Sequence, residues 1–255
     1  IPRIDYSNGV GAVLVEPFVT NQIRYSEDFS NSLWLKTAVT LTSSTGTNPR
    51  GESATIYAIQ GQNQQGGLEA AMASSASGNG VGASIWARKK SGVGTTNVEI
   101  VYGDSSTVYT TTVSVGADWQ RITHNSVSYT SANRFYIDAE GTSADNTIEI
   151  WGAQLEKTAS AGQAGRVSSY MPTTSGTTTR TRTNYLNGGD ASLIGAQEGV
   201  LFVEAAAVVD SGVSRGIALS AANSAANRVA LFYRSTNGQV LVIVQGSSGY
   251  ISLVA

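Results

Sequence analysis

The chain has 255 residues, 13% of them charged, and a formal net charge of −2, which argues against a broad basic surface for nucleic acid and against a charged, disordered tail. It contains no cysteine, so disulfides and thiolate metal sites are excluded. The hydrophobic fraction of 41% is enough to bury a core, and no apolar run approaches the roughly 20 residues of a membrane-spanning helix. This length suits two domains of ordinary size or one large all-β domain.

The first 20 residues are predicted to form an N-terminal β-arm. Ile4–Asp5 begins a strand that ends in a Ser-Asn-Gly turn, and Gly11–Pro17 is a short apolar strand. We expect this arm to pack on the following domain or on a neighbouring chain.

Residues 21–172 are predicted to form an antiparallel jelly-roll β-sandwich. Val98, Ile100 and Tyr102 alternate with polar residues, which is the pattern of a half-buried strand. Regularly spaced runs of this kind, separated by Gly, Ser, Asn and Asp turns, are typical of a sandwich or jelly roll. The candidate strands are Ser53–Ala58, Gly82–Lys89, Asn97–Tyr102, Val108–Val115, Gln120–Tyr129, Arg134–Ala139 and Thr147–Trp151.

The segment 148–172 is predicted to close this sandwich and to lead the chain away from it. Gly152–Glu156 is expected to carry the chain off the sheet, and Ser169–Pro172 to dock it before a connector. We interpret Trp151 and Tyr170 as packing anchors rather than ligand contacts.

Residues 173–197 read as a Thr-rich connector, and residues 198–255 as the start of a second β-sandwich. The Asn237-Gly238 pair between two apolar runs is a strong hairpin signal. Four or five strands do not complete a sandwich, so we expect the chain to be a piece of a longer polypeptide. The candidate strands are Gly199–Val208, Arg215–Leu219, Arg228–Tyr233 and Gln239–Gln245.

Three passages of the first 173 residues resemble one known family. They are Pro2–Tyr6 with Val15–Pro17 and Thr20–Asn21, Tyr25–Asn31 with Trp34, and Trp151–Glu156 with Ser169–Thr173. Together they resemble the carbohydrate-binding-module-like jelly rolls of bacteriophage tail fibres and other virion appendage proteins. Glu198–Glu204 and the residues after it resemble the start of a concanavalin-A-like (laminin-G-like) domain.

The resemblance implies an extracellular, virion-located structural protein of a fibre or appendage. Such proteins are usually homotrimers, so the implied partners are further copies of the chain, other virion proteins and host-surface polysaccharide. Neither a nucleic-acid partner nor membrane insertion is predicted. The alternative is a secreted carbohydrate-binding module of a bacterial glycan-active enzyme.

No catalytic residue is predicted, and the chain is interpreted as a non-enzyme. His124 is the sole histidine, and without a Gly-x-Ser-x-Gly motif it is interpreted as an ordinary strand residue rather than part of a triad. Glycoside cleavage needs only two carboxylates, and Asp138, Glu140 and Glu149 lie on or beside predicted strands. A depolymerase is therefore a third hypothesis, which the lack of an internal repeat disfavours.

A glycan site is predicted on aromatic side chains, because an aromatic ring stacks on the apolar face of a sugar ring. The alternative is that these aromatic side chains belong to the core or to a subunit interface, which is the more common role of an aromatic residue on a β-strand. The candidate ligand-binding residues are Trp86, Tyr102, Tyr109, Tyr129 and Tyr136.

The resemblance also implies a structural calcium ion near the first strand. Glu27 and Asp28 lie in a suitable turn and are the candidate ligands, since calcium takes carboxylate and backbone oxygens. No other cofactor is predicted.

Overall fold

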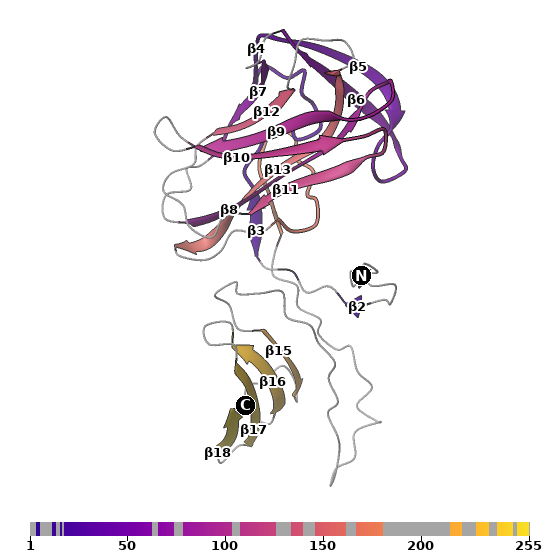
Figure 1. The fold of residues 1–255 in the computed structure, drawn as a ribbon. Helices are drawn as coiled ribbons and strands as arrows, with labels where there is room; N and C mark the ends of the chain where they lie inside the picture. Colours follow the sequence, from indigo (N-terminus) through magenta and orange to yellow (C-terminus); the bar gives the residue numbers. More distant parts are fainter. Residues whose placement is uncertain are drawn as a thin grey trace. The chain divides into compact units, whose positions relative to one another are not determined.

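The computed structural model describes residues 4–5, 12–13, 16, 18–62, 66–73, 79–103, 108–125, 134–139, 146–161, 167–180, 215–220, 228–234, 239–246 and 249–254 (Figure 1). Within these ranges the regular elements are β-strands in antiparallel sheets, which confirms the predicted fold class. None of the described residues lies in a helix able to cross a membrane. The chain divides into two compact units, one formed by residues 16–182 and the other by residues 1–15 and 183–255.

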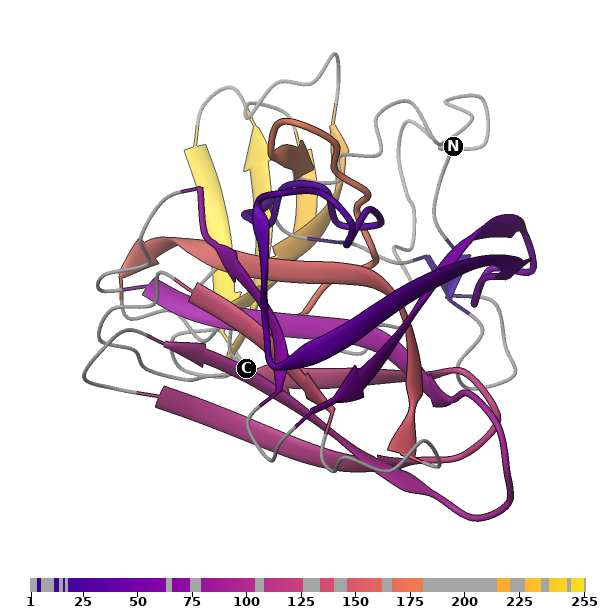
Figure 2. The same cartoon turned by 90° about the horizontal axis from the view of Figure 1, so that it is seen from above.

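The unit of residues 16–182 is a sandwich of two antiparallel sheets. The five-stranded sheet has the order β10 (Val108–Val115), β9 (Thr96–Gly103), β12 (Arg134–Ala139), β7 (Gly67–Ala71) and β4 (Trp34–Thr37). The seven-stranded sheet runs through β11 (Gln120–Asn125), β8 (Asn79–Lys89), β13 (Ile148–Ala161), β3 (Val19–Asn21) and β14 (Thr178–Arg180). It is completed by β6 (Ser53–Gly61), which pairs with β13, and by β5 (Val39–Thr47), which pairs with β6; these two form the long indigo hairpin of Figure 2.

The core lies between the two sheets and is built from their inward-facing side chains. Val98, Ile100 and Tyr102 are fully buried, as their alternation predicted. An aromatic cluster fills one part of this core. Its ring centroids lie 4.8 Å apart for Phe29 and Trp34, 5.5 Å for Phe29 and Tyr57, and 6.4 Å for Trp34 and Phe135.

A β-bulge in β13 changes which residues of this strand face the core. Trp151 pairs with Trp86, but Gln154 pairs with Ser84, so β13 has one more residue than β8 between these two pairs. Ile148 and Ile150 face inward before the bulge, and Ala153 and Leu155 face inward after it. Gln154 and Glu156 are therefore directed to the outer side of the sheet.

The expectation that Gly152–Glu156 leaves the sheet is wrong. These residues stay in β13, which pairs with β8 along most of its length. The closing strand simply runs past the predicted end, because the bulge at Gly152 (φ 68°) interrupts the alternation without ending the pairing. Trp151 is buried, as expected of a packing anchor.

The Thr-rich segment after Pro172 contributes a strand. Residues 178–180 form β14, which pairs with β3, and Thr178 Oγ1 donates to the Pro172 carbonyl at 2.8 Å. The compact sandwich unit thus extends to Arg182, beyond the predicted domain end at 172.

Most predicted strands of the sandwich are present. Val108–Val115 and Arg134–Ala139 match residue for residue, and the others are longer or shorter at their ends. β11 ends at Asn125, and residues 126–133 lie outside the described residues. The prediction missed β3, β4, β5, β7 and β14.

In the other unit, β1 (Ile4–Asp5) pairs with β2 (Ala12–Val13). A separate four-stranded antiparallel sheet contains β15 (Arg215–Ser220), β16 (Arg228–Arg234), β17 (Gln239–Gly246) and β18 (Gly249–Val254). Arg234 opposes Gln239, so the hairpin predicted from Asn237-Gly238 is confirmed. The predicted strand 199–208 lies outside the described residues.

Candidate functional site

The outer face of the five-stranded sheet gathers one aromatic ring and several charged groups from three strands. Directly opposed residues of an antiparallel sheet share a face. Tyr136 of β12 lies opposite Val101 of β9 and Glu69 of β7, while Asp138 lies opposite Glu99. Since Val98, Ile100 and Tyr102 point into the core, this set points away from it. We call the set Glu69, Glu99, Val101, Arg134, Tyr136 and Asp138 the tyrosine face.

An exposed arginine links two members of the tyrosine face. Nη1 of Arg134 donates to the Tyr136 hydroxyl at 3.1 Å and lies 3.3 Å from Oε1 of Glu69. These contacts hold the phenol beside a carboxylate on the half-buried surface of the sheet. The ion pair contributes little to stability by itself, because half of the arginine side chain is exposed.

The Asp138 carboxylate lies over Gly67 of the neighbouring strand. A Cβ atom at Gly67 would stand only 1.9 Å from Oδ1 of Asp138, so the glycine leaves the space that this side chain occupies. With Glu69 and Glu99 on the neighbouring strands, three carboxylates and a phenol ring share the face. Such a surface can bind a ligand that has an apolar face for the ring and hydroxyl groups for the carboxylate acceptors.

The prediction that Tyr102 contacts a ligand is wrong. Its side chain is fully buried in the core, so it cannot reach a ligand. Its ring is stacked on that of Tyr109 with centroids 5.2 Å apart, and it meets His124 edge-on at 5.1 Å. Tyr109 is half-buried and packs against the core, which matches the alternative interpretation of a strand aromatic.

Trp86 and Tyr136 lie on opposite sides of the sandwich. Trp86 is on the outer side of the seven-stranded sheet, half-buried and in register with the buried Trp151. Tyr170 covers Trp151 with ring centroids 4.9 Å apart. The two predicted aromatics therefore belong to different surfaces and do not form one site. Tyr129 lies outside the described residues.

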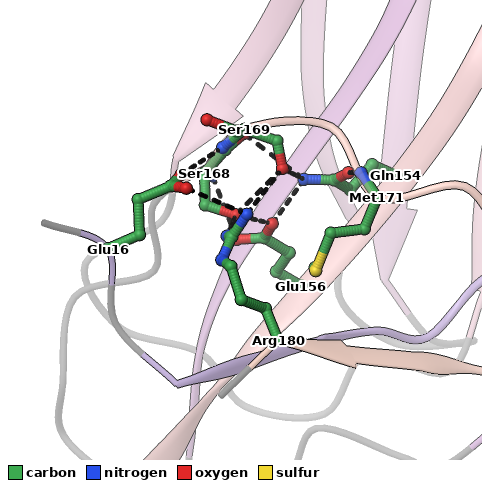
Figure 3. A network of polar contacts seen from close by, with 7 residues as sticks. All are labelled: Glu16, Gln154, Glu156, Ser168, Ser169, Met171 and Arg180. Atoms are coloured by element: carbon green, nitrogen blue, oxygen red, sulfur yellow. Dashed lines mark hydrogen bonds and ion pairs between the residues drawn. The ribbon is translucent and has the colours of Figure 1, made fainter. Parts of the chain in front are cut away.

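A buried polar network, shown in Figure 3, joins Glu16 to three segments of the chain between residues 154 and 180. Glu16 accepts from the Ser169 amide at 2.6 Å and pairs with Arg180 at 3.1 Å. Glu156 of β13 accepts from the Ser168 amide at 3.1 Å and from the Ser168 hydroxyl. We call the network the joint; its members are Glu16, Gln154, Glu156, Ser168, Ser169, Met171 and Arg180.

Gln154 completes the joint by binding the segment 168–171. Its Oε1 accepts from the Met171 amide at 2.7 Å, and its Nε2 donates to Glu156. Ser168, Ser169 and Met171 are thus held on the outer side of β13, which fits the predicted docking of residues 169–172. The joint is a packing device, because its polar atoms are engaged with one another.

Burial raises the pKa of Glu156 from 4.5 to about 7. The Ser168 donors, Arg180 and Arg121 act in the opposite direction but do not offset the loss of hydration. Tyr170 lies in the same region, and burial raises its pKa as well. Glu156 is consequently a carboxyl group that titrates near neutral pH inside the joint.

The candidate calcium ligands are engaged with neighbouring side chains. Oδ1 of Asp28 accepts from the Tyr57 hydroxyl at 2.8 Å and from the Ser30 amide at 3.1 Å, and the Ser30 hydroxyl lowers the pKa of this carboxyl group. Glu27 lies beside Tyr170. No group of three or more histidine, cysteine or acidic side chains able to hold a metal occurs among the described residues. These two side chains do not make a calcium cage by themselves, and calcium stays a prediction.

Sequence reasoning missed most of the tyrosine face, and in the joint it predicted the docking of residues 169–172 but not the roles of Glu16, Glu156 and Arg180. Glu69, Glu99 and Arg134 sit on separate strands and give no local signal, whereas the aromatic character of Tyr136 did. Alternation along β9 was the usable clue to which acidic residues face outward. Glu16 is far in sequence from the other members of the joint, which all lie between residues 154 and 180, so no short motif contains the whole network.

No protein-family model and no curated protein matches the sequence. Among solved structures, the chain is similar to an exo-β-agarase, with 10% identity and a TM-score of 0.42 over 56% of this chain and 25% of that one. It is similar to the enzymatically active domain of tailspike protein 4 of bacteriophage CBA120, with 16% identity and a TM-score of 0.40 over 54% and 21%. It is also similar to the CBM22-1 xylan-binding domain of Xyn10C from Paenibacillus barcinonensis, with 11% identity and a TM-score of 0.41 over 56% and 94%. The chain spans a quarter or less of the first two proteins, and none of these likenesses assigns a role to a residue.

Proposed function

We propose that this chain is a non-catalytic carbohydrate-binding module whose ligand lies on the tyrosine face. The observation that carries the proposal is the position of Tyr136 between Glu69 and Val101, with Arg134 bonded to its hydroxyl. The ring offers an apolar platform for a pyranose, and the charged groups around it offer both donors and acceptors to hydroxyl groups. A sheet face of this kind recognises a chain of sugars lying across the strands.

The proposed setting is a fibre or appendage of a bacteriophage virion, where the module attaches to host-surface glycan. Two consecutive β-rich segments, a low content of charged residues, the lack of cysteine and the motif resemblance support it. The second candidate is a secreted module of a bacterial glycan-active enzyme, which the same tyrosine face would serve. Coding sequence for a catalytic domain beside this one would favour the second candidate.

Ligand binding is tested with the 255-residue chain on an array of plant, algal and bacterial glycans, followed by calorimetry with the best ligand. Tyr136→Ala should weaken binding about tenfold, since a lost ring contact of about 1.4 kcal/mol corresponds to that factor. Trp86→Ala is the matched control, because Trp86 lies on the opposite side of the sandwich.

The binding of the two variants shows which sheet carries the ligand site. Loss of binding in Trp86→Ala with unchanged binding in Tyr136→Ala would move the site to the seven-stranded sheet. Wild-type chain that binds no glycan would leave a purely structural role. Release of reducing ends from the bound glycan would contradict the non-catalytic assignment and favour the depolymerase hypothesis.

A further inference from the structure

The turn 28–31 is held by a lysine ammonium. Nζ of Lys36 donates to the carbonyl of Ser30 at 3.0 Å and to the carbonyl of Asn31 at 2.7 Å. Lys36 belongs to β4, at the edge of the five-stranded sheet. Asp28 acts on the same amine: loss of hydration lowers the pKa of Lys36, and the charge of Asp28 works in the opposite direction. A positive group is therefore placed on two carbonyls of this turn and near its carboxylate.

The carboxylate of this turn is bound from the other sheet. Oδ1 of Asp28 accepts from the hydroxyl of Tyr57 at 2.8 Å, and from the amide of Ser30 at 3.1 Å and its hydroxyl at 2.5 Å. Tyr57 belongs to β6, in the seven-stranded sheet. The turn is therefore connected to both sheets of the sandwich, by Lys36 to one and by Tyr57 to the other.

The neighbouring carboxylate, that of Glu27, lies beside the hydroxyl of Tyr170. Burial raises the pKa of this phenol and the charge of Glu27 raises it further, so the hydroxyl keeps its proton at neutral pH. The same hydroxyl is 2.8 Å from Oγ of Ser26. Both of the candidate calcium ligands therefore stand next to a tyrosine hydroxyl.

These contacts compete with a metal ion for the same atoms. Calcium binds carboxylate and backbone carbonyl oxygens and takes roughly six to eight of them. The turn offers oxygens of that kind, but its two carbonyls accept from the Lys36 ammonium and Oδ1 of Asp28 accepts from three donors. The ammonium would also repel a divalent cation that approached these carbonyls. The residues of the turn therefore do not fit a calcium ion while Lys36 is bound there.

We propose that the Lys36 ammonium closes the turn 28–31 in place of the calcium ion that the resemblance implies. An ammonium carries three donors, and two of them are used on the carbonyls of the turn. The turn carries Phe29 into the aromatic cluster, where its fully buried ring packs on Trp34 and Tyr57. A lysine of the same sandwich thus supplies the positive charge that holds this part of the core, and the stability of the sandwich does not depend on calcium.

Thermal unfolding of the 255-residue chain, followed by tryptophan fluorescence, tests the proposal. All four tryptophans lie in the unit 16–182, so this signal reports the sandwich. The wild type should unfold at the same temperature in EDTA, in calcium chloride and in magnesium chloride. Lys36→Met should lower the unfolding midpoint by about 2–4 °C, because two charge-assisted hydrogen bonds are lost. Lys90→Met is the matched control, since Lys90 is an exposed lysine next to the end of β8.

A wild-type midpoint that rises in calcium chloride but not in magnesium chloride overturns the proposal, because a bound ion stabilises the folded chain by mass action. Equal midpoints of Lys36→Met and Lys90→Met overturn it too, since the ammonium would then close nothing. Lys36→Gln keeps a donor without the charge, and it also serves if Lys36→Met does not fold. Its midpoint should lie below that of the wild type, and a midpoint equal to the wild type would show that no cation is needed at the turn.

Discussion

The carboxylate of Glu16 and the guanidinium of Arg180 form a buried ion pair, with Oε2 and Nη1 3.1 Å apart and side-chain exposures of 4% and 10%. The sandwich unit begins at Glu16 and ends at Arg182, so the pair joins its two ends. Ser169 is bonded to both partners, through its amide to Glu16 and through its carbonyl to Arg180. The ends of the unit are therefore tied to the segment docked on β13.

Removing one partner of this pair should destabilise the sandwich strongly. Arg180→Ala leaves Glu16 as a buried charge without its cation, a change that typically costs about 3–5 kcal/mol. Urea unfolding measures the loss as a lower midpoint. Arg50→Ala is the control, because Arg50 pairs with Glu52 at the surface and both side chains are more than half exposed. A change below about 1 kcal/mol in Arg180→Ala would show that the joint is not a stabilising element.

Stability should depend on pH through Glu156. Its pKa is about 7 in the folded chain, and its ordinary value of 4.5 applies to the unfolded chain. Between these pH values the folded chain holds a proton that the unfolded chain has released. The free energy of unfolding must then fall as pH rises from about 4.5 to 7, by up to ~3 kcal/mol, and level off above. Arg180 and Arg121 lower the pKa of Glu156 and so move this midpoint, and Glu16 faces the same network through its ion pair with Arg180.

Urea unfolding at pH values from 4.5 to 8 checks this dependence. Glu156→Gln should remove the fall of stability between pH 4.5 and 7, because a neutral amide keeps the shape and accepts from Ser168 at every pH, and it should leave the opposite contribution of His124. The control is Glu52→Gln, which changes an exposed carboxylate and should leave the slope in place. An unchanged slope in Glu156→Gln would assign the pH dependence to other groups.

Much of the sandwich was predictable because apolar and polar residues alternate along its central strands. The period of two in β9 identifies its inward residues, and the same pattern gives β10 and β12 with their bounds. The polar strand β5 was missed because most of its residues are exposed, so no apolar pattern marks it. β4 and β7 are short, and only Trp34 of β4 is buried.

The sites were less predictable than the fold, because they depend on pairing rather than on local sequence. Tyr102 and Tyr136 both lie on strands with alternating residues. Their positions in the alternation differ, so Tyr102 faces the core and Tyr136 faces outward. The bulge at Gly152 shifts the alternation of inward and outward side chains within β13 by one residue. Glu156 therefore faces outward and lies in the joint. No single-sequence rule locates such a bulge in advance.

Substitution of Gly152 should disturb the bulge. Its φ of 68° is in the left-handed region, and a Cβ atom would lie 3.2 Å from the Tyr170 ring and 3.4 Å from Trp86. Gly152→Ala should therefore lower the free energy of unfolding by about 1–2 kcal/mol or more, from backbone strain and crowding together. Gly176→Ala is the control, since nothing lies within 4 Å of its Cβ position and its φ is not in that region. Equal stability of the two variants would contradict the strain argument.

His124 should titrate below the ordinary histidine value of 6.5. Burial lowers the pKa of the imidazole, whose Nδ1 is hydrogen-bonded to the Thr111 hydroxyl and whose ring meets Tyr102 edge-on. A group with a lowered folded pKa gives stability that is fully present above 6.5 and is lost as the pH falls from 6.5 through the lower folded pKa. Because His124 is the sole histidine, its ring protons give one resolved set of NMR signals to follow against pH. A midpoint at or above 6.5 would place the ring in water rather than between the sheets.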